Sequence, residues 1–209
     1  DGTTGKINYT VWSDVLICPQ CLVEYTFWDT AVNGESGEIQ KVYSCPNCDA
    51  EIDKDSSERA TFTFFDNAIN RQATQSKQVP VLINYSVGKK RYEKKPDEFD
   101  LDLNDKIDSL IIPYWFPVSR MPEGDESRRN DKVGITHVHH FYTKRTLYFL
   151  STFVEQIKKQ PHLSQFLSWF LTAGALVHTK MYAFRANRKG GIIKGTLYVS
   201  SLFQENNPM

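Results

Sequence analysis

The sequence predicts an α+β protein, with antiparallel hairpins at the N-terminus and then a mixed strand–helix domain with two long C-terminal helices. Three observations predict it. Four cysteines form two CxxC pairs within the first 48 residues, strand-like alternation of apolar and polar residues recurs around and after them, and two helix-length apolar segments follow residue 143. We expect residues 1–58 to form the first unit and residues 59–209 the second. With 209 residues, 40% of them hydrophobic, the chain can build its own core.

The cysteines carry the strongest chemical signal. Cys18 and Cys21 form one CxxC pair, and Cys45 and Cys48 form the other after 23 intervening residues. A hairpin of that length can bring the two pairs together, so that four thiolates surround one Zn²⁺ ion. The alternatives are a redox dithiol or two disulfides, but a redox site needs one CxxC within a βαβ unit, which neither pair has. The first unit is therefore predicted to be a zinc ribbon whose closed metal site is structural.

The remaining elements follow from local patterns. Apolar spacing predicts a helix over residues 96–110, and Thr143 is a plausible N-cap for a helix that ends near residue 159. A second helix over residues 163–182 is apolar nearly all round, so we expect it to be buried. Residues 121–132 are predicted to be a polar loop. Strands are predicted at residues 11–17, 38–44, 60–69, 79–87 and 195–200. Residues 22–32 are also rich in aromatic and β-branched residues, and a turn at residues 33–37 joins them to the strand at 38–44.

Charge is distributed unevenly although the net charge is zero. Residues 1–132 carry 16 Lys/Arg and 23 Asp/Glu, whereas residues 133–209 carry 9 and 2. A basic C-terminal part faces a polyanion or docks on an acidic segment such as residues 97–108. Aromatic residues adjoin two basic clusters there, and Arg and Lys beside a helix start or on a Gly-rich loop suit phosphate contacts. The candidate DNA-contacting residues are Lys144, Arg145, Arg185, Arg188 and Lys189.

The basic turn after residue 87 is a solvated hairpin tip or a further phosphate contact. His137, His139 and His140 raise a metal hypothesis, but no Asp, Glu or Cys near them in the sequence completes a site. A structural role, with one histidine buried and hydrogen-bonded, is the favoured interpretation.

Absent motifs restrict the function further. The chain has no GxGxxG, GxxxxGK[ST] or GxSxG motif, and no Gly-rich turn follows a strand to receive a nucleotide or adenosyl cofactor. No apolar run approaches the roughly 18–20 residues of a membrane span. We therefore expect a binding module without a membrane partner, located in the cytoplasm.

Several segments resemble the bacterial and archaeal DNA methyltransferases that modify an exocyclic amine, N6 of adenine or N4 of cytosine, in a subgroup that bears a zinc ribbon. The similar segments span nearly the whole chain: residues 5–14, 80–85, 112–117, 134–145 and 195–202. That family has a doubly wound catalytic domain, which binds S-adenosylmethionine at a Gly-rich turn and uses an (Asp/Asn)-Pro-Pro-(Tyr/Phe) motif. Neither motif is present here, since residues 112–115 read IPYW and residues 206–209 read NNPM.

The resemblance implies that the chain is an insert region of such an enzyme and is not itself a complete catalyst. In methyltransferases of that motif order the region between the two motifs commonly recognises the target. The implied partners are DNA and the catalytic domain of the parent enzyme, which would hold S-adenosylmethionine. The implied role is to grip DNA and help present a flipped base. The other interpretation is a docking module that packs on another part of the enzyme and does not itself touch DNA.

Overall fold

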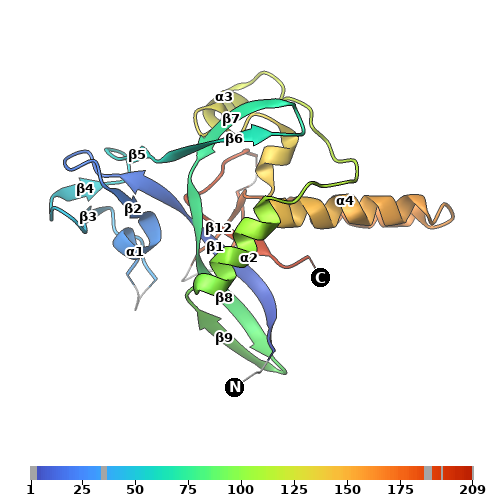
Figure 1. Ribbon diagram of the computed structural model, residues 1–209, viewed down its shortest axis with the longest axis horizontal. Coiled ribbons are helices and arrows are strands. Elements are labelled where there is room, and N and C mark those ends of the chain that lie inside the picture. Colours follow the sequence, from blue (N-terminus) through green and yellow to red (C-terminus); the bar gives the residue numbers. More distant parts are fainter. Residues whose placement is uncertain (1–3, 34–36, 186–189, 194, 209) are drawn as a thin grey trace.

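The computed structural model of the chain describes residues 4–33, 37–185, 190–193 and 195–208. Over these residues the protein is a mixed α+β fold with a large antiparallel sheet at its centre (Figure 1), which confirms the α+β part of the prediction. The sheet runs in the order β11-β10-β12-β1-β8-β9, and β2 and β5 also pair with β1. Its strands are β1 (Lys6–Ile17), β2 (Glu24–Thr26), β5 (Glu58–Arg59), β8 (Gln78–Val87), β9 (Lys90–Lys94), β10 (Tyr182–Ala183), β11 (Gly191–Ile192) and β12 (Leu202–Asn206).

Strand β1 is the longest of the described strands and lies at the centre of this sheet. Its sequence is rich in β-branched and aromatic residues, and every residue from Thr10 to Leu16 is buried. Its partners β8 and β12 lie on opposite edges, both antiparallel. The pairing with β8 shifts register where Trp12 lies opposite Pro80, a residue that cannot donate a ladder hydrogen bond.

Two hairpins lie outside the large sheet. Strands β3 (Val42–Ser44) and β4 (Glu51–Asp53) form one, beside the short helix α1 (Phe27–Ala31). Strands β6 (Thr61–Asp66) and β7 (Arg71–Ser76) form the other, which lies at the end of the molecule opposite the β8–β9 hairpin (Figure 1). The strands predicted at residues 11–17, 38–44, 60–69 and 79–87 correspond to β1, β3, β6 and β8, although β3 is shorter than expected. Residues 22–32 are a strand only in β2, because α1 follows it directly.

The helix predicted over residues 96–110 is α2 (Glu98–Asp108). Asp97 caps it by accepting a hydrogen bond from the Asp100 backbone, while the Asp100 side chain accepts one from the Asp97 backbone. The polar loop predicted at residues 121–132 is wrong in part, because α3 (Asp125–Asp131) lies within it. Acidic residues in the first turn of α3 and basic residues in its last turn interact favourably with the helix dipole and stabilise the helix.

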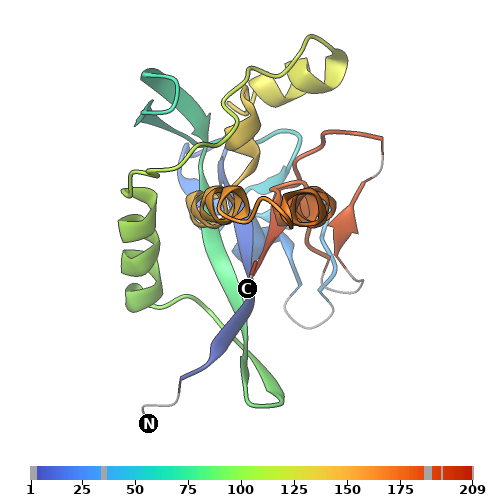
Figure 2. The same ribbon diagram turned by 90° about the vertical axis from the view of Figure 1, so that its right-hand side faces the viewer.

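The C-terminal helices are shorter than the sequence predicts. Helix α4 (Lys144–Lys158) begins at the predicted cap, where the Thr143 side chain accepts from the Thr146 backbone. Helix α5 (Ser164–Ala175) ends before residue 182, and a 3₁₀ turn, η2 (Leu176–His178), follows it. The expectation that this second helix is buried is wrong, since no residue of α5 is buried. Helices α4 and α5 lie side by side and project from the body (Figures 1 and 2), which leaves α5 exposed to solvent.

The closing strand also differs from the prediction. It is β12 at Leu202–Asn206, whereas residues 195–200 form no strand. Side-chain contacts hold that segment instead: the Leu197 backbone N–H donates to the Glu126 carboxylate of α3 at 3.0 Å. Val199 packs with Ile135, Phe141 and Met181 in a second small core.

Gly134 lies next to this core, where the chain packs closely against the β6–β7 hairpin. Its φ is +79°, and an added Cβ would overlap the Thr74 carbonyl and lie 2.7 Å from the Gln75 Cα. We expect Gly134→Ala to lower the free energy of unfolding by about 2–4 kcal/mol, from the left-handed backbone and the overlap together. Gly88→Ala is the control, because Gly88 has φ +59° with open space around it and should lose only about 1–2 kcal/mol. Urea unfolding measures both, and equal losses would contradict the close packing.

Candidate metal centre

The four cysteines lie on two separate turns that share the same backbone hydrogen-bond pattern. In the first, the Leu22 backbone N–H donates to the Cys18 carbonyl and the Cys18 N–H donates to the Val23 carbonyl. In the second, Asp49 donates to Cys45 and Cys45 donates to Ala50 in the same pattern. Leu22 and Asp49 both have positive φ, at 61° and 58°. Each CxxC pair therefore forms a tight knuckle that directs both sulfurs to one side.

The two knuckles face each other, although 23 residues separate them in the sequence. Cys18 Sγ lies 3.8 Å from Cys48 Sγ, and Cys21 Sγ lies 3.7 Å from Cys45 Sγ. All four sulfurs lie within 4.8 Å of one another, and all four thiols are free. Sulfurs at about 2.3 Å from a tetrahedral Zn²⁺ are about 3.8 Å apart. The cluster is thus compatible with a structural zinc, and the two-disulfide alternative does not fit the structure.

Protonation in this cluster also favours a cation. The backbone N–H of Val23 lowers the pKa of Cys21 to about 6, and the backbone N–H of Asn47 lowers the pKa of Cys45. Although the Ala50 N–H favours its thiolate, burial and hydrogen bonds to the other cysteines raise the pKa of Cys48 to about 12. Four sulfurs at this separation cannot all ionise alone, whereas a divalent cation would stabilise all four thiolates.

Aromatic residues from three elements pack around the knuckles. Tyr25, Phe27 and Tyr43 are buried with Leu16 and Ile52 in one cluster that includes Cys18 and Cys45. The Tyr25 and Tyr43 rings meet edge to face with centroids 6.1 Å apart. Because no fourth-ligand position is left for water or substrate, a metal here would hold these elements together and would not catalyse.

Comparison with known proteins found no matching family model, no similar curated protein and no similar solved structure. The methyltransferase resemblance therefore rests on the sequence segments named above. None of the described helices is long and apolar enough to cross a membrane.

The predicted DNA-contacting residues do not form one described surface. Arg145 Nη1 lies 3.4 Å from Glu205 Oε2, a carboxylate that is 4% exposed, so Arg145 neutralises a buried charge. Lys144 is half-buried at the start of α4, and Arg185 is exposed after β10. Arg188 and Lys189 lie outside the described residues. A role in DNA contact stays a prediction for all five.

The three histidines form a cluster that the sequence predicted only in part. His137, His139 and His140 are all buried, and Asp66 completes the group. Asp66 Oδ2 lies 2.9 Å from His139 Nε2 and 2.8 Å from His140 Nε2. Sequence reasoning missed Asp66 because it precedes His139 by 73 residues, and no local pattern links the end of β6 to that turn.

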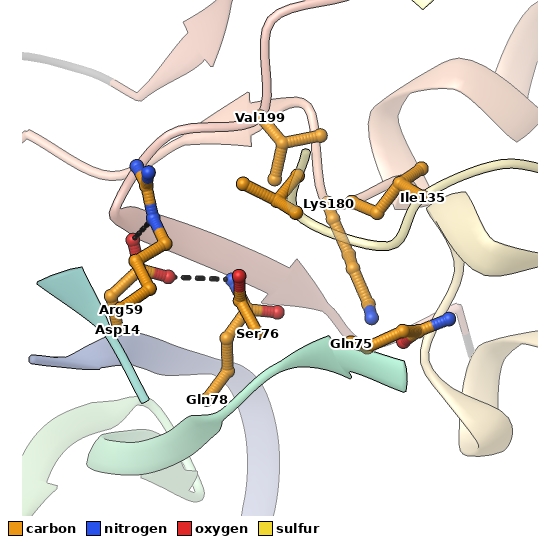
Figure 3. Close-up of a pocket in the computed structure, with 9 residues that line it drawn as sticks. Asp14, Arg59, Gln75, Ser76, Gln78, Ile135, Lys180 and Val199 are labelled. Carbon is orange, nitrogen blue, oxygen red and sulfur yellow. Dashed lines mark hydrogen bonds and ion pairs between the residues drawn. The ribbon is translucent and has the colours of Figure 1, made fainter. Parts of the chain in front are cut away.

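A small pocket lies between the sheet and the C-terminal segment (Figure 3). Asp14 in this pocket is already paired, with Arg59 Nε at 2.8 Å and Gln78 Nε2 at 3.0 Å. Lys180 extends into the same pocket, where burial lowers its pKa to about 8 despite nearby Asp108 and Glu205. Because Asp14 is already paired with Arg59, the described residues of this pocket do not provide a free carboxylate for acid–base catalysis.

Zinc is expected to be required for the N-terminal fold. Cys45→Ser should lose the bound zinc and expose the aromatic cluster, because metal binding and folding of such sites are coupled by about 10 kcal/mol or more. Ser44→Ala is the control, since Ser44 is the exposed neighbour of Cys45. Zinc content by mass spectrometry and near-UV circular dichroism measure the change. Loss of zinc without loss of the near-UV signal would contradict a structural role.

Lys180 should make stability depend on pH above neutrality. Because its folded pKa is about 8 and its ordinary value is 10.5, only the unfolded chain keeps this proton between those pH values. Stability should therefore rise with pH across that window, by up to about 3 kcal/mol. Lys180→Met should remove this rise, whereas Lys77→Met, at an exposed lysine paired with Glu24, should keep it. Urea unfolding at pH 7, 8.5 and 10 tests this, and equal pH slopes in both variants contradict it.

Proposed function

We propose that this chain is a non-catalytic, zinc-stabilised region of an S-adenosylmethionine-dependent DNA methyltransferase, and that it docks on the catalytic domain of its parent enzyme. The sequence resemblance supplies the parent, and the exposed apolar face of α5 carries the docking role. In this proposal the first unit is a zinc ribbon, and S-adenosylmethionine belongs to the parent's catalytic domain.

The apolar surface of α5 is far larger than a surface helix needs. Phe166, Trp169 and Phe170 are 63%, 67% and 59% exposed, and Leu163 at the helix start is 45% exposed. Large aromatic side chains contribute about 150–250 Å² each when they are buried. A contiguous apolar patch of this kind is a feature of protein–protein contact sites. At about 25 cal/mol per Å², covering it stabilises a complex substantially.

Helix α2 adds a second exposed apolar segment. Phe99, Leu101 and Leu103 are 74%, 44% and 42% exposed, and none of the residues of α2 is buried. Helices α2 and α5 lie on opposite sides of α4 when the projecting pair is viewed end on (Figure 2). A partner that covers this end of the molecule would contact both helices, which supports docking within a larger protein.

Direct DNA contact is a second candidate function, favoured by the tip of the β8–β9 hairpin. Lys89, Lys90 and Arg91 are exposed there, and the hairpin projects from the body beside β1 (Figure 1). None of the three forms an ion pair with a described residue. Cations without carboxylate partners on a projecting hairpin suit phosphate oxygens. Together with Arg185 they would let the region grip DNA while the catalytic domain holds the flipped base.

The docking proposal predicts that a charge on α5 weakens binding of the catalytic domain. The double variant Phe166→Glu/Trp169→Glu should bind the separately expressed catalytic domain at least about tenfold more weakly, a loss of about 1.4 kcal/mol. Phe65→Glu is the matched control, since Phe65 is 54% exposed but lies on the β6–β7 hairpin. Biolayer interferometry measures the affinities. Equal binding by both variants and the wild type would contradict docking through α5.

DNA contact predicts a steep dependence on salt. Fluorescence anisotropy of a labelled random-sequence duplex should show binding that weakens log-linearly as salt rises, because phosphate contacts release counterions. The triple variant Lys89→Ala/Lys90→Ala/Arg91→Ala should reduce that slope by about 3. Lys158→Ala, which removes an exposed lysine paired with Glu155, should not change it. No binding at low salt would reject DNA contact and leave the docking proposal intact.

A further inference from the structure

The strongest unassigned feature is the convergence of Asp66, His139 and His140. Asp66 is the last residue of β6, and the two histidines lie on the 3₁₀ turn η1 (Val138–Phe141) that precedes α4. Asp66 Oδ1 accepts a hydrogen bond from the Ala68 backbone N–H at 2.9 Å, which fixes the carboxylate. Its other oxygen, Oδ2, faces both imidazoles through their Nε2 atoms, at 2.9 and 2.8 Å.

These three side chains are buried from water. Asp66, His139 and His140 are 6%, 7% and 4% exposed, and one ligand atom from each lies within 4.8 Å of the others. The site also has a polar atom that the protein leaves unpaired. His139 Nδ1 is buried and has no hydrogen-bond partner among the described atoms. This nitrogen is on the other side of the ring from Nε2, so it is not a ligand atom, and an ion bound at Nε2 would leave it as an N–H.

We propose that Asp66, His139 and His140 bind a divalent transition-metal ion, such as Zn²⁺, at a second metal site separate from the four cysteines. Two imidazole nitrogens and one carboxylate oxygen are ligands that Zn²⁺ and similar ions accept, whereas Mg²⁺ and Ca²⁺ prefer oxygen alone. Ligand atoms at about 2.0–2.1 Å from a tetrahedral ion are about 3.3 Å apart. Each Nε2–Oδ2 distance must therefore lengthen by only about 0.5 Å to admit the ion.

The hydrogen bonds of the cluster define where the ring proton of His140 lies before an ion binds. The Thr136 backbone N–H donates to His140 Nδ1 at 3.3 Å, which places the ring proton on Nε2 beside Asp66. When Nε2 binds the ion, this proton moves to Nδ1, the bond from the Thr136 N–H is lost, and the Thr136 hydroxyl, 3.4 Å away, becomes the hydrogen-bond acceptor of Nδ1–H.

His137 lies beside the site but is not a ligand. Its Nδ1 lies 2.7 Å from the Thr136 hydroxyl, and its Nε2 lies 3.3 Å from Arg71 Nη2. Since a guanidinium can only donate, His137 Nε2 is the acceptor of that hydrogen bond and both ring nitrogens are engaged. The proposed ion therefore has three protein ligands, and a water molecule would complete a tetrahedral site.

Such an ion would attach the β6–β7 hairpin to the body of the protein. The hairpin forms its own two-stranded sheet, and Phe62 and Phe65 on it are 44% and 54% exposed. A two-stranded hairpin is marginally stable by itself. A metal bridge from Asp66 to η1 would fix the turn end of the hairpin, where Asp66 pairs with Arg71, so the role of this site is structural.

Zinc stoichiometry tests the second site. Protein equilibrated with excess Zn²⁺ and passed over a weak chelating resin should retain two zinc ions per chain by plasma mass spectrometry, one at each group of ligands. Asp66→Asn and His139→Gln should each retain one, whereas His178→Gln, at a histidine outside the cluster, should retain two. One zinc in the wild type that is unchanged in Asp66→Asn and lost in Cys45→Ser would overturn the proposal.

Cobalt titration of the wild-type protein gives a result that does not depend on the folding of any variant. The first equivalent of Co²⁺ should fill the thiolate site and give intense sulfur-to-cobalt charge-transfer bands. A second equivalent should add d–d absorption in the visible range without a further rise in charge transfer, since its ligands are nitrogen and oxygen. Saturation of all bands at one equivalent would overturn the second site.

Discussion

The backbone pairing of β1 on both edges is the interaction on which the other parts of the structure depend. Its N-terminal half lies between β8 and β12, and its C-terminal end pairs with β2 and β5 before it reaches Cys18. The same strand thus builds the centre of the large sheet and positions the first cysteine knuckle. Because both of its faces are covered from Thr10 to Leu16, a shift in its register would move side chains in both regions.

Burying β1 also buries charge, and each buried carboxylate is matched by specific donors. Asp14 is 2% exposed and pairs with Arg59 and Gln78. Glu205 of β12 lies opposite Thr10 of β1 and is 4% exposed. It accepts a hydrogen bond from Trp12 Nε1 at 2.8 Å, and Arg145 supplies the opposite charge. Unpaired, such groups would be strongly destabilising. The demand for a partner explains why Arg145, on α4, faces inward in place of meeting solvent or a phosphate.

The two clusters of potential metal ligands each join segments that are far apart in the sequence. The cysteine cluster joins β1 to the β3–β4 hairpin, and the Asp66 cluster joins the β6–β7 hairpin to η1. The β3–β4 hairpin lies on the side of the molecule opposite the projecting α4–α5 pair (Figure 1), whereas η1 directly precedes α4. Helix α5 packs on α4 and keeps its aromatic side chains exposed, which is the kind of surface that a docking region would offer a partner.

Much of the fold and the cysteine cluster could be predicted from the sequence, because their signals are local. CxxC spacing determines the knuckle geometry through hydrogen bonds within five residues, and the Asp97 and Thr143 caps act within three residues of their own positions. Helix α3 carried a weaker local signal, the charge order along its turns, and the prediction missed it.

Local patterns in the chain thus predict the α+β class, the knuckles, the starts of α2 and α4 and most of the strands. Packing between distant segments brings Asp66 to His139 and His140, pairs Arg145 with Glu205 and leaves α5 exposed. The apolar composition of α5 predicts that another surface covers this helix, but it does not identify that surface. The reason is physical: capping and knuckle formation depend on neighbouring residues, whereas burial and charge pairing depend on contacts between segments some 60 or more residues apart.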